Sequence, residues 1–400
     1  MQLKLIPAIT GLMAMAASVQ SATLDNVLEE AVTAGRVPGV VAMIASADEV
    51  LYAGAFGHAD VGSDLPMVTD SVFRIASMTK PLTSVAALQL SEKGKVALDA
   101  PMSDYLPDFS PRPILLSAAS AEGARYSDAT YTPTLRQLLS HSSGFVYSVW
   151  NELLFSVTDL TQVTPTSYRQ EPLLFVPGSE WHYSTSTDWL GDIVEQVSGL
   201  SLEEYFAANI VEPLGMRDTA YNLPQAKWKR VVTRHQRSAD GLVEAPTNDL
   251  AEVTHFSGGA GLKSTAADYV RFMQAMLGSS KVPAILQPDT IAAMGSGQIG
   301  DATVGKMRTQ IPSFSNDFLV NPGVDSTFGL GFQINTEDVP GGRRAGSLAW
   351  AGLYNTYFWI DPESDLCGVL LTQILPFYDA EVVDLLAAFE REAYRAYRSN

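Results

Sequence analysis

Strand patterns stand at both ends of this 400-residue chain, and helical patterns fill the stretch between them. Near the N-terminus, the apolar runs Val40–Ala45 and Val50–Phe56 flank a short polar segment and predict a β-hairpin. Near the C-terminus, three further runs predict strands before a closing helix over Asp379–Arg398: Gly329–Ile334, Thr356–Ile360 and Cys367–Thr372. We therefore expect one central antiparallel sheet built from both termini.

Helical periodicity dominates the middle of the chain. A first helix over Leu24–Ala34 ends at Gly35, and further helices are predicted over Pro81–Gly94, Leu135–Leu139, Thr187–Gly199, Ser201–Ile210 and Thr265–Leu277. Segments rich in Gly, Pro and Ser predict loops over Ala118–Tyr131 and Gly295–Val324, the second as a lid or rim. The chain is thus expected to be α+β. An α/β domain would comprise residues 23–81 and 320–400, a mostly helical inserted domain residues 82–319, and the active site their interface.

Charge and cysteine content exclude several classes of function. The chain has 26 Lys plus Arg and 44 Asp plus Glu, a net charge of −18, which disfavours nucleic acid and anionic lipid as partners. Cys367 is the single cysteine, so a disulfide framework or a multi-cysteine metal site is excluded, and a buried strand position is expected for it. The five histidines lack metal-ligand spacing. No metal and no cofactor is predicted.

The first 22 residues predict a secretory signal peptide. Lys4 is followed by the apolar run Leu5–Ala17 and by small residues that suit a cleavage site. This favours export to the periplasm or the medium; an amphipathic first helix of a cytoplasmic protein is the alternative. No other segment reaches the ~20 apolar residues of a membrane span.

The sharpest chemical signal is the pair Ser77 and Lys80. If Ser77 opens a helix, Lys80 lies one turn later on the same face and its amine can reach the serine hydroxyl. A serine nucleophile needs such a neighbouring base. Alone, the pattern is weak, because an N-cap serine followed by a solvated lysine gives the same spacing.

Two later segments give that pair a context. Tyr183-Ser184-Thr185 follows Ser77 by 106 residues, where a turn leads into a helix, and Trp350-Ala351-Gly352 follows Tyr183 by 167 residues, just before an expected strand. On its own, Tyr183 would be interpreted as a core aromatic. A Ser-His-Asp hydrolase of the α/β type is disfavoured, because the chain has no Gly-x-Ser-x-Gly elbow.

These motifs resemble those of the serine β-lactamase and penicillin-binding-protein superfamily, and among its class C-like members the family VIII carboxylesterases. The resemblance runs from about Leu24 to the C-terminus, and it is carried by Ser77–Lys80, Thr134–Gly144, Pro177–Ser184 and Gly258–Thr265. It implies a β-lactamase/transpeptidase-like fold. It also implies an acyl-enzyme on Ser77, with Lys80 and Tyr183 shuttling protons, and an oxyanion hole made by the backbone N–H groups of Ser77 and Leu353.

Two departures from the lactamase pattern favour esters over lactams. The resemblance would place an asparagine where Thr185 stands and a lysine where Trp350 stands. Without that lysine, the carboxylate of a β-lactam would be buried unpaired, at a high cost in free energy. Arg343 and Arg344 are candidates to replace the charge, although solvated turn positions are favoured for both.

The implied activity is hydrolysis of short- to medium-chain carboxylic esters, small molecules that need no cofactor. Either Lys80 or Tyr183, with ordinary pKa values of about 10.4 and 10, must lose its proton near neutral pH to act as the base. The substrate pocket is expected to include Trp350-Ala351-Gly352 and Thr185. For Trp150, Phe145, Tyr147 and Trp181, the sequence leaves both a pocket position and a core position open. The alternatives are a β-lactamase, D-alanyl peptidase, amidase or acyltransferase on the same scaffold, or a non-catalytic relative.

Overall fold

The computed structural model describes residues 22–120, 123–245, 251–319 and 323–397. A helix runs over residues 22–33, and Gly35 follows with φ of +69°, in the left-handed region that ends many helices. The predicted first helix is confirmed. The predicted signal peptide lies outside the described residues, except for Ala22, which begins this helix.

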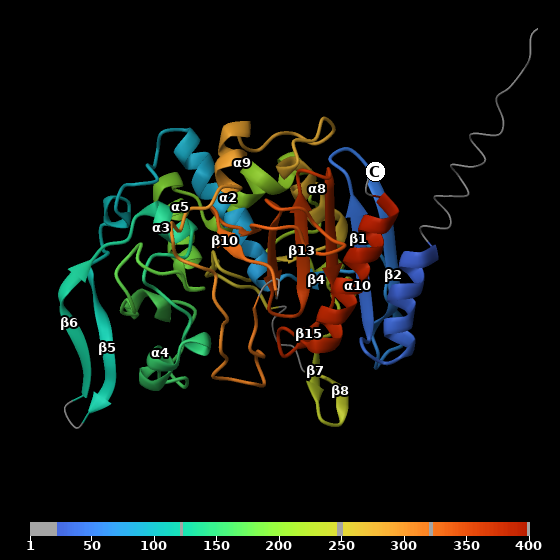
Figure 1. Cartoon of the computed structure of the whole chain (residues 1–400), viewed down its shortest axis with the longest axis horizontal. Coiled ribbons are helices and arrows are strands. Elements are labelled where there is room, and N and C mark those ends of the chain that lie inside the picture. Colours follow the sequence, from blue (N-terminus) through green and yellow to red (C-terminus); the bar gives the residue numbers. More distant parts are fainter. Residues whose placement is uncertain (1–21, 121–122, 246–250, 320–322, 398–400) are drawn as a thin grey trace, which may run out of the picture.

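The described part of the chain forms a sheet of eight strands in the order β10-β11-β12-β13-β14-β1-β2-β3 (Figure 1). Neighbouring strands run antiparallel, and the pairing of β1 with β14, which sets Val41 opposite Leu371, joins the two ends of the chain. The predicted sheet from both termini is confirmed. Its strands are β1 Gly39–Ala45, β2 Val50–Asp60, β3 Leu65–Pro66, β10 Ser326–Phe328, β11 Gln333–Asn335, β12 Leu348–Gly352, β13 Thr356–Asp361 and β14 Leu366–Leu371.

One strand prediction needs correction, and one strand was not predicted. The predicted strand Gly329–Ile334 is mostly a turn that leads into β11, because Gly331 has φ of +102° and packs so closely on Ser84 that a Cβ would lie 2.4 Å from its hydroxyl oxygen. Trp350-Ala351-Gly352 precedes β13, as predicted, but these residues also end β12, a strand that was not predicted.

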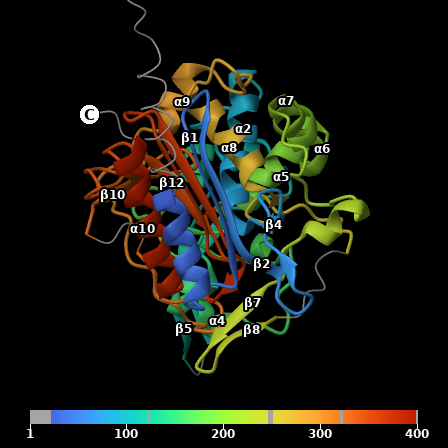
Figure 2. The same ribbon diagram turned by 90° about the vertical axis from the view of Figure 1, so that its right-hand side faces the viewer.

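Helices cover both faces of the sheet. On one face, the helix of residues 22–33 lies beside α10 (Ala380–Tyr397), which turns a buried stripe of Val382, Leu385, Phe389 and Ala393 inward (Figure 2). On the other face, α8 (Ala266–Met276) packs against β1 and β14. The sheet is therefore buried between two helical layers, with the closing helix where it was predicted.

The remaining helices form the helical part of the molecule around α2, whose residues Thr79–Leu90 are all buried. Four of these helices and α8 confirm the five predicted for the middle of the chain: α2 Thr79–Glu92, α3 Leu135–Leu139, α5 Ser186–Ser198, and α6 Leu202–Phe206 with the π-helical turn Ala207–Val211 that follows it. The short helices α4 Glu152–Val157, α7 Glu212–Leu214 and α9 Pro288–Met294 were not predicted. α2 packs against α5, which brings the segments before both helices together. The division into two domains at residues 81 and 320 stays a prediction.

The loop predicted over Ala118–Tyr131 is wrong. Those residues form a hairpin of β5 (Arg112–Ser120) and β6 (Gly123–Tyr131) that projects at one end of the molecule (Figure 1). The second loop, Gly295–Val324, is irregular as predicted in its described part, apart from isolated bridges between Met307 and Phe318 and between Ser315 and Phe377. Small sheets complete the fold: β15 Ile374–Leu375 with β7 His235–Ser238 and β8 Gly241–Glu244, and β4 Phe73–Arg74 with β9 Lys263–Ser264.

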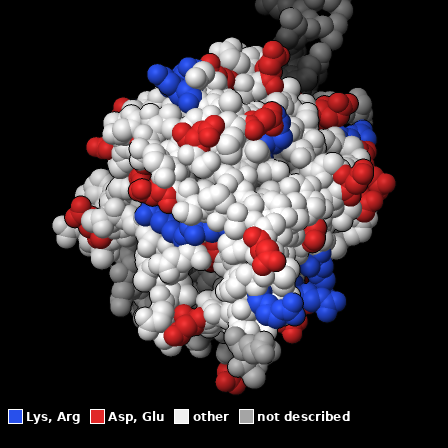
Figure 3. Space-filling view, turned by 90° about the vertical axis from the view of Figure 1, so that its left-hand side faces the viewer, with Lys and Arg blue, Asp and Glu red and all other residues white. Residues whose placement is uncertain are grey.

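Charged side chains are dispersed on the face drawn in Figure 3, where acidic and basic residues stand among uncharged ones. In the part of the chain that the structure describes, no helix combines the length and apolar composition of a membrane span.

Candidate active site

Ser77 occupies a strained turn directly before α2. It is the middle residue of a 3-10 turn, Ala76–Met78, and the preceding Ala76 has φ of +45°, an unfavourable conformation for a residue with a side chain. From Ser71 to Lys80, only Ser77 is not buried. The fold therefore presents this hydroxyl at a point where its neighbours are enclosed.

Lys80, in the first turn of α2, points back toward that hydroxyl. Its Nζ lies 3.3 Å from the Oγ of Ser77, as the spacing predicted. The same nitrogen lies 2.7 Å from the carbonyl oxygen of Gly259 and 3.0 Å from the hydroxyl oxygen of Tyr147. Three oxygen atoms thus surround the Nζ of Lys80, a residue that is only 2% exposed.

The carbonyl of Gly259 reaches Lys80 because a glycine turn packs tightly against α5. A Cβ on Gly258 would lie 2.2 Å from the carbonyl oxygen of Thr187, so this position needs glycine. Asp188 accepts a hydrogen bond of 3.1 Å from the backbone N–H of Gly259 and another from the Ser257 hydroxyl. Asp188 therefore holds the turn whose carbonyl holds Lys80.

Tyr183 lies on the other side of Lys80, just before α5. Lys80 Nζ stands over its ring, 4.9 Å from the centroid. The Tyr183 hydroxyl is buried and has no hydrogen-bond partner among the described residues. The Tyr183 ring packs on Trp350 and Trp150, with centroid distances of 4.8 and 5.4 Å. The three residues expected to be catalytic are thus in one place.

A small hollow separates Ser77 from an aromatic wall. Its volume is about 20 Å³, and it is lined by Ser77, Trp150, Tyr183, Phe318, Trp350, Ala351, Gly352, Leu353 and Phe377. Apart from the Ser77 and Tyr183 hydroxyls, the side chains in this wall are apolar or aromatic. The space next to the serine is therefore small and apolar.

Gly352 lets β12 pass directly beside the Ser77 segment. A Cβ at this position would lie 2.2 Å from the carbonyl oxygen of Ile75 and 2.3 Å from the Thr356 hydroxyl oxygen. The absence of a side chain brings the next residue, Leu353, into the wall of the same hollow as Ser77. The two residues expected to form the oxyanion hole are thus adjacent to one space.

Thr185 does not line this hollow. It is the residue at the N-terminus of α5, and its hydroxyl donates a hydrogen bond of 3.0 Å to a carboxylate oxygen of Glu171. Burial raises the pKa of Glu171 to about 7; the Thr185 hydrogen bond opposes this shift and the nearby charge of Asp188 adds to it. The third position of the tyrosine motif therefore faces a second buried carboxyl group rather than the serine.

The other predicted aromatic residues separate into two groups. Trp150 lines the hollow and Tyr147 binds Lys80, whereas Phe145 packs on Trp189 and Trp181 on Phe328, with centroid distances of 5.7 and 5.6 Å. Phe145 and Trp181 are both buried in the core. Two lining residues were missed: Phe318, inside the predicted rim loop, and Phe377, which carries no motif.

Neither arginine candidate faces the serine. Arg343 is buried in an ion pair with Glu390 at 2.7 Å, contrary to the solvated position favoured for it, and Arg344 pairs with Asp338 at 2.6 Å on the surface. Neither lines the hollow at Ser77. The arginines therefore do not replace the missing lysine.

His141 packs behind the site as an uncharged imidazole. Burial, and then the charge of Lys80, hold the pKa of His141 well below its ordinary value, and its Nδ1 lies 2.9 Å from the Ser184 hydroxyl. Its ring contacts Tyr183 at 5.2 Å without reaching the hollow. Among the described residues, no three His, Cys, Asp or Glu side chains gather as metal ligands would.

Comparison with protein families adds independent information. The family model described as "Beta-lactamase" matches residues 24–392. Monacolin J acid methylbutanoyltransferase of Aspergillus terreus is 31% identical over 410 residues, covering 96% of this chain and 98% of its own. Esterase EstB of Burkholderia gladioli is 30% identical over 388 residues, covering 88% of this chain and 90% of its own.

Solved structures show the same relationship. Unliganded simvastatin synthase LovD of Aspergillus terreus superposes with a TM-score of 0.82 at 29% identity, over 95% of this chain and 99% of its own. EstCE1, described as a hydrolase with promiscuous acyltransferase activity, gives a TM-score of 0.74 at 26% identity, over 94% of this chain and 100% of its own.

Proposed function

The chain belongs to the beta-lactamase family, whose transpeptidase-like fold it has, and we propose that this hydrolase is a serine carboxylesterase acting on short- to medium-chain esters. One observation carries the proposal: the hollow at Ser77 is apolar, with Trp350 where the resemblance expected a lysine. The reacting carbonyl group of an uncharged ester can lie in such a space without leaving a buried charge unpaired. Esterase EstB, 30% identical, supports the same reading.

In the proposed first step, the Oγ of Ser77 attacks the ester carbonyl carbon. The Ser77 proton passes to the member of the Lys80–Tyr183 pair that has lost its own proton, the carbonyl oxygen takes up negative charge, and the tetrahedral intermediate collapses as the C–O bond to the alcohol breaks. The pair returns the proton to the departing alkoxide. The 3.3 Å contact between Lys80 and Ser77 and the unpartnered Tyr183 hydroxyl support this route.

The second step repeats the chemistry with water. Water attacks the acyl carbon, gives a proton to the Lys80–Tyr183 pair, and the acid leaves as the proton returns to the Ser77 oxygen. In both steps the backbone N–H groups of Ser77 and Leu353 would stabilise the oxyanion, each donor typically contributing about 3 kcal/mol. The packing of Gly352 on Ile75, which sets Leu353 beside Ser77, supports this role.

Transfer of the acyl group to an alcohol is the second candidate. An alcohol that replaces water in the second step gives a new ester instead of an acid, and the residues needed are the same. The monacolin J acid methylbutanoyltransferase, 31% identical, favours this alternative as strongly as EstB favours hydrolysis. The apolar side chains of Trp150, Phe318 and Trp350 that line the hollow suit an organic acceptor as well as an ester.

A partition experiment tests the proposal. Purified protein would be given p-nitrophenyl butyrate with increasing concentrations of 1-butanol, and butyric acid and butyl butyrate would be measured beside p-nitrophenol. The esterase account expects acid as the main product in dilute alcohol and little turnover of a chromogenic cephalosporin. Butyl butyrate as the main product at millimolar alcohol would establish the transferase, and cephalosporin turnover at a comparable rate would refute the ester preference.

A further inference from the structure

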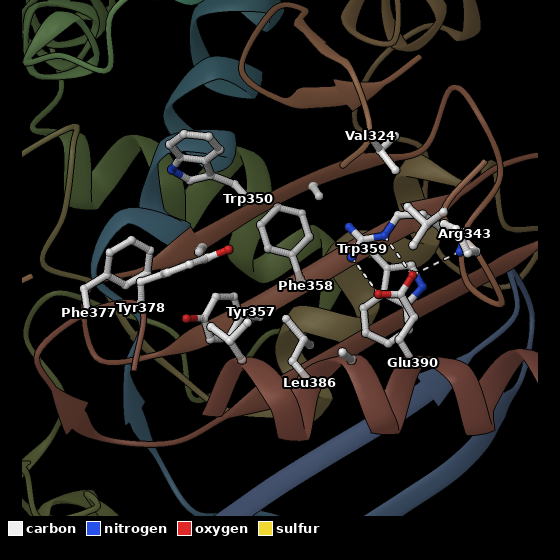
Figure 4. A pocket seen from close by; sticks show the side chains of 16 residues that line it. Val324, Arg343, Trp350, Tyr357, Phe358, Trp359, Phe377, Tyr378, Leu386 and Glu390 are labelled. Carbon is white, nitrogen blue, oxygen red and sulfur yellow. Dashed lines mark hydrogen bonds and ion pairs between the residues drawn. The ribbon is translucent and has the colours of Figure 1, made fainter. Parts of the chain in front are cut away.

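A second and larger cavity lies behind β12, between the sheet and α10 (Figure 4). Its volume is about 210 Å³, against about 20 Å³ for the hollow at Ser77. Ala349 and Ala351 of β12 line it together with their partners on β13, Trp359 and Tyr357. Two small side chains beside two large ones leave this part of the face unfilled.

The walls of the cavity are mostly apolar. Val383, Leu386 and Ala387 of α10 line one side, and Val324, Val339 and Pro340 line it from the segments that precede β12. Several of these side chains are only partly buried, so the cavity communicates with solvent.

The charges at one end of the cavity satisfy each other. Arg343 donates to Glu390 through Nε at 2.9 Å, through Nη2 at 2.7 Å and through its backbone N–H at 3.0 Å. A charged ligand would have to break this pair, whereas an uncharged apolar chain would not. The cavity therefore suits hydrocarbon.

The cavity and the hollow at Ser77 share part of their walls. Trp350, Ala351 and Phe377 line both spaces. The centroid of the Phe377 ring lies 5.1 Å from that of Phe318, which lines the hollow. It lies 6.2 Å from that of Tyr357, which lines the cavity. Phe377 thus stands between the serine and the larger space, and a side chain of this kind can change rotamer.

We propose that the cavity behind β12 receives the distal part of an apolar acyl chain, with Phe377 as the partition that turns aside. This inference rests on the proposed function, because it concerns the chain of an acyl group bound to Ser77. The hollow beside the serine holds no more than a group of about the size of water. The acyl half stays on the enzyme through both steps while the alcohol must leave, so the acyl half is the one that an interior cavity suits.

Filling the cavity tests the proposal. Ala387→Phe places an aromatic ring in it, and Ala388→Phe is the matched control, since Ala388 is the next residue of α10 and does not line the cavity. For p-nitrophenyl esters from acetate to decanoate, we expect the decanoate-to-acetate ratio of kcat/KM to fall at least tenfold in Ala387→Phe and to stay within twofold in the control. An unchanged ratio in Ala387→Phe, or an equal fall in both variants, would overturn the proposal.

Opening the partition provides the converse variant. Phe377→Ala should raise the decanoate-to-acetate ratio at least fivefold, and a series of acetate esters with longer alcohols should show no such preference. A gain confined to the alcohol series would refute the acyl assignment.

A binding measurement separates failure of this inference from failure of the proposed function. 2-Decanone, an uncharged ketone that cannot be hydrolysed, should raise the Tm of the wild type and of Ala388→Phe by several degrees, but not that of Ala387→Phe. If no p-nitrophenyl ester is hydrolysed, the proposed function fails while this comparison still reports on the cavity. Equal shifts in all three proteins, or none, would overturn the cavity as the acyl site.

Discussion

The Nζ of Lys80 lies 3.0 Å from the hydroxyl oxygen of Tyr147, whereas the hydroxyl of Tyr183, the expected catalytic tyrosine, has no hydrogen-bond partner among the described residues. Lys80 faces Tyr183 through the ring instead, at 4.9 Å from its centroid. The two tyrosines thus contact Lys80 differently, Tyr147 through its hydroxyl and Tyr183 through its ring. Tyr147 accepts a hydrogen bond that fixes Lys80, and Tyr183 keeps a hydroxyl available to the proton of Ser77.

Tyr147→Phe should therefore weaken catalysis through Lys80 without removing a reacting group. It removes one of the three oxygen partners of the buried Lys80 Nζ, and hydrogen bonds of this kind contribute about 1–3 kcal/mol. We expect kcat/KM on p-nitrophenyl butyrate to fall about 10- to 100-fold and the pH–rate profile to shift. The control is Tyr52→Phe on the distant β2 strand, which removes a hydrogen bond to Asp25. Equal activity of the two variants would contradict a positioning role for Tyr147.

Tyr183→Phe removes the hydroxyl assigned to proton transfer. The loss should exceed that of Tyr147→Phe and fall mainly on kcat, because the phenylalanine ring keeps the packing on Trp350 and Trp150. We expect a reduction of at least about 100-fold, as is common for general acid–base groups. Steady-state kinetics of the two variants side by side test this order, and a Tyr183→Phe enzyme with nearly full kcat would exclude Tyr183 from the proton pathway.

Gly352→Ala tests whether the close approach of β12 to Ile75 builds the site. The added Cβ would lie 2.2 Å from a backbone oxygen that precedes Ser77 by two residues, so the strand or the turn must move. We expect a loss of kcat/KM of about 100-fold or more together with a lowered Tm. Gly305→Ala is the matched control, because nothing lies within 4 Å of a Cβ there. Wild-type activity in Gly352→Ala would contradict this placement of Leu353.

Much of this arrangement follows from local patterns in the sequence. The spacing of Ser77 and Lys80 is one helical turn, so a helix start suffices to bring them together. The hairpin of β1 and β2 and the amphipathic α10 have the periodicities that predict them. The roles of Tyr183 and of the oxyanion-hole residues were predicted from the family resemblance, because no local sequence pattern links Tyr183 to Ser77.

What the sequence did not reveal depends on contacts between distant segments. The position of Phe377 as a partition follows from the packing of Phe318, Tyr357 and Phe377, which are far apart along the chain. β12 was missed because Ala351 and Gly352 are weak strand formers held in place by pairing with β13. Tyr147 resembled a pocket aromatic in sequence, and only the structure shows its hydroxyl at Lys80.

Glu171 predicts a pH dependence of stability. Burial raises its pKa to about 7, above the value of about 4.3 in an unfolded chain, so the folded protein retains a proton that the unfolded chain has released between these values. Stability should therefore fall as pH rises from about 4.5 to 7 and level off above that. Glu171→Gln should remove this component, on the order of 1–3 kcal/mol. Denaturant unfolding at pH 5 and pH 8 measures it, and the same pH dependence in both proteins would refute the shift.

The central claim is that Ser77 carries the acyl group, and intact-mass measurement during turnover tests it most directly. Wild type and Ser77→Ala would be mixed with p-nitrophenyl butyrate, quenched in acid within seconds, and digested to locate any adduct. The account predicts a butyryl group on the peptide that contains Ser77 in the wild type, and neither adduct nor p-nitrophenol release above background in a folded Ser77→Ala protein. Hydrolysis by Ser77→Ala near the wild-type rate, or an adduct on another residue, would contradict it.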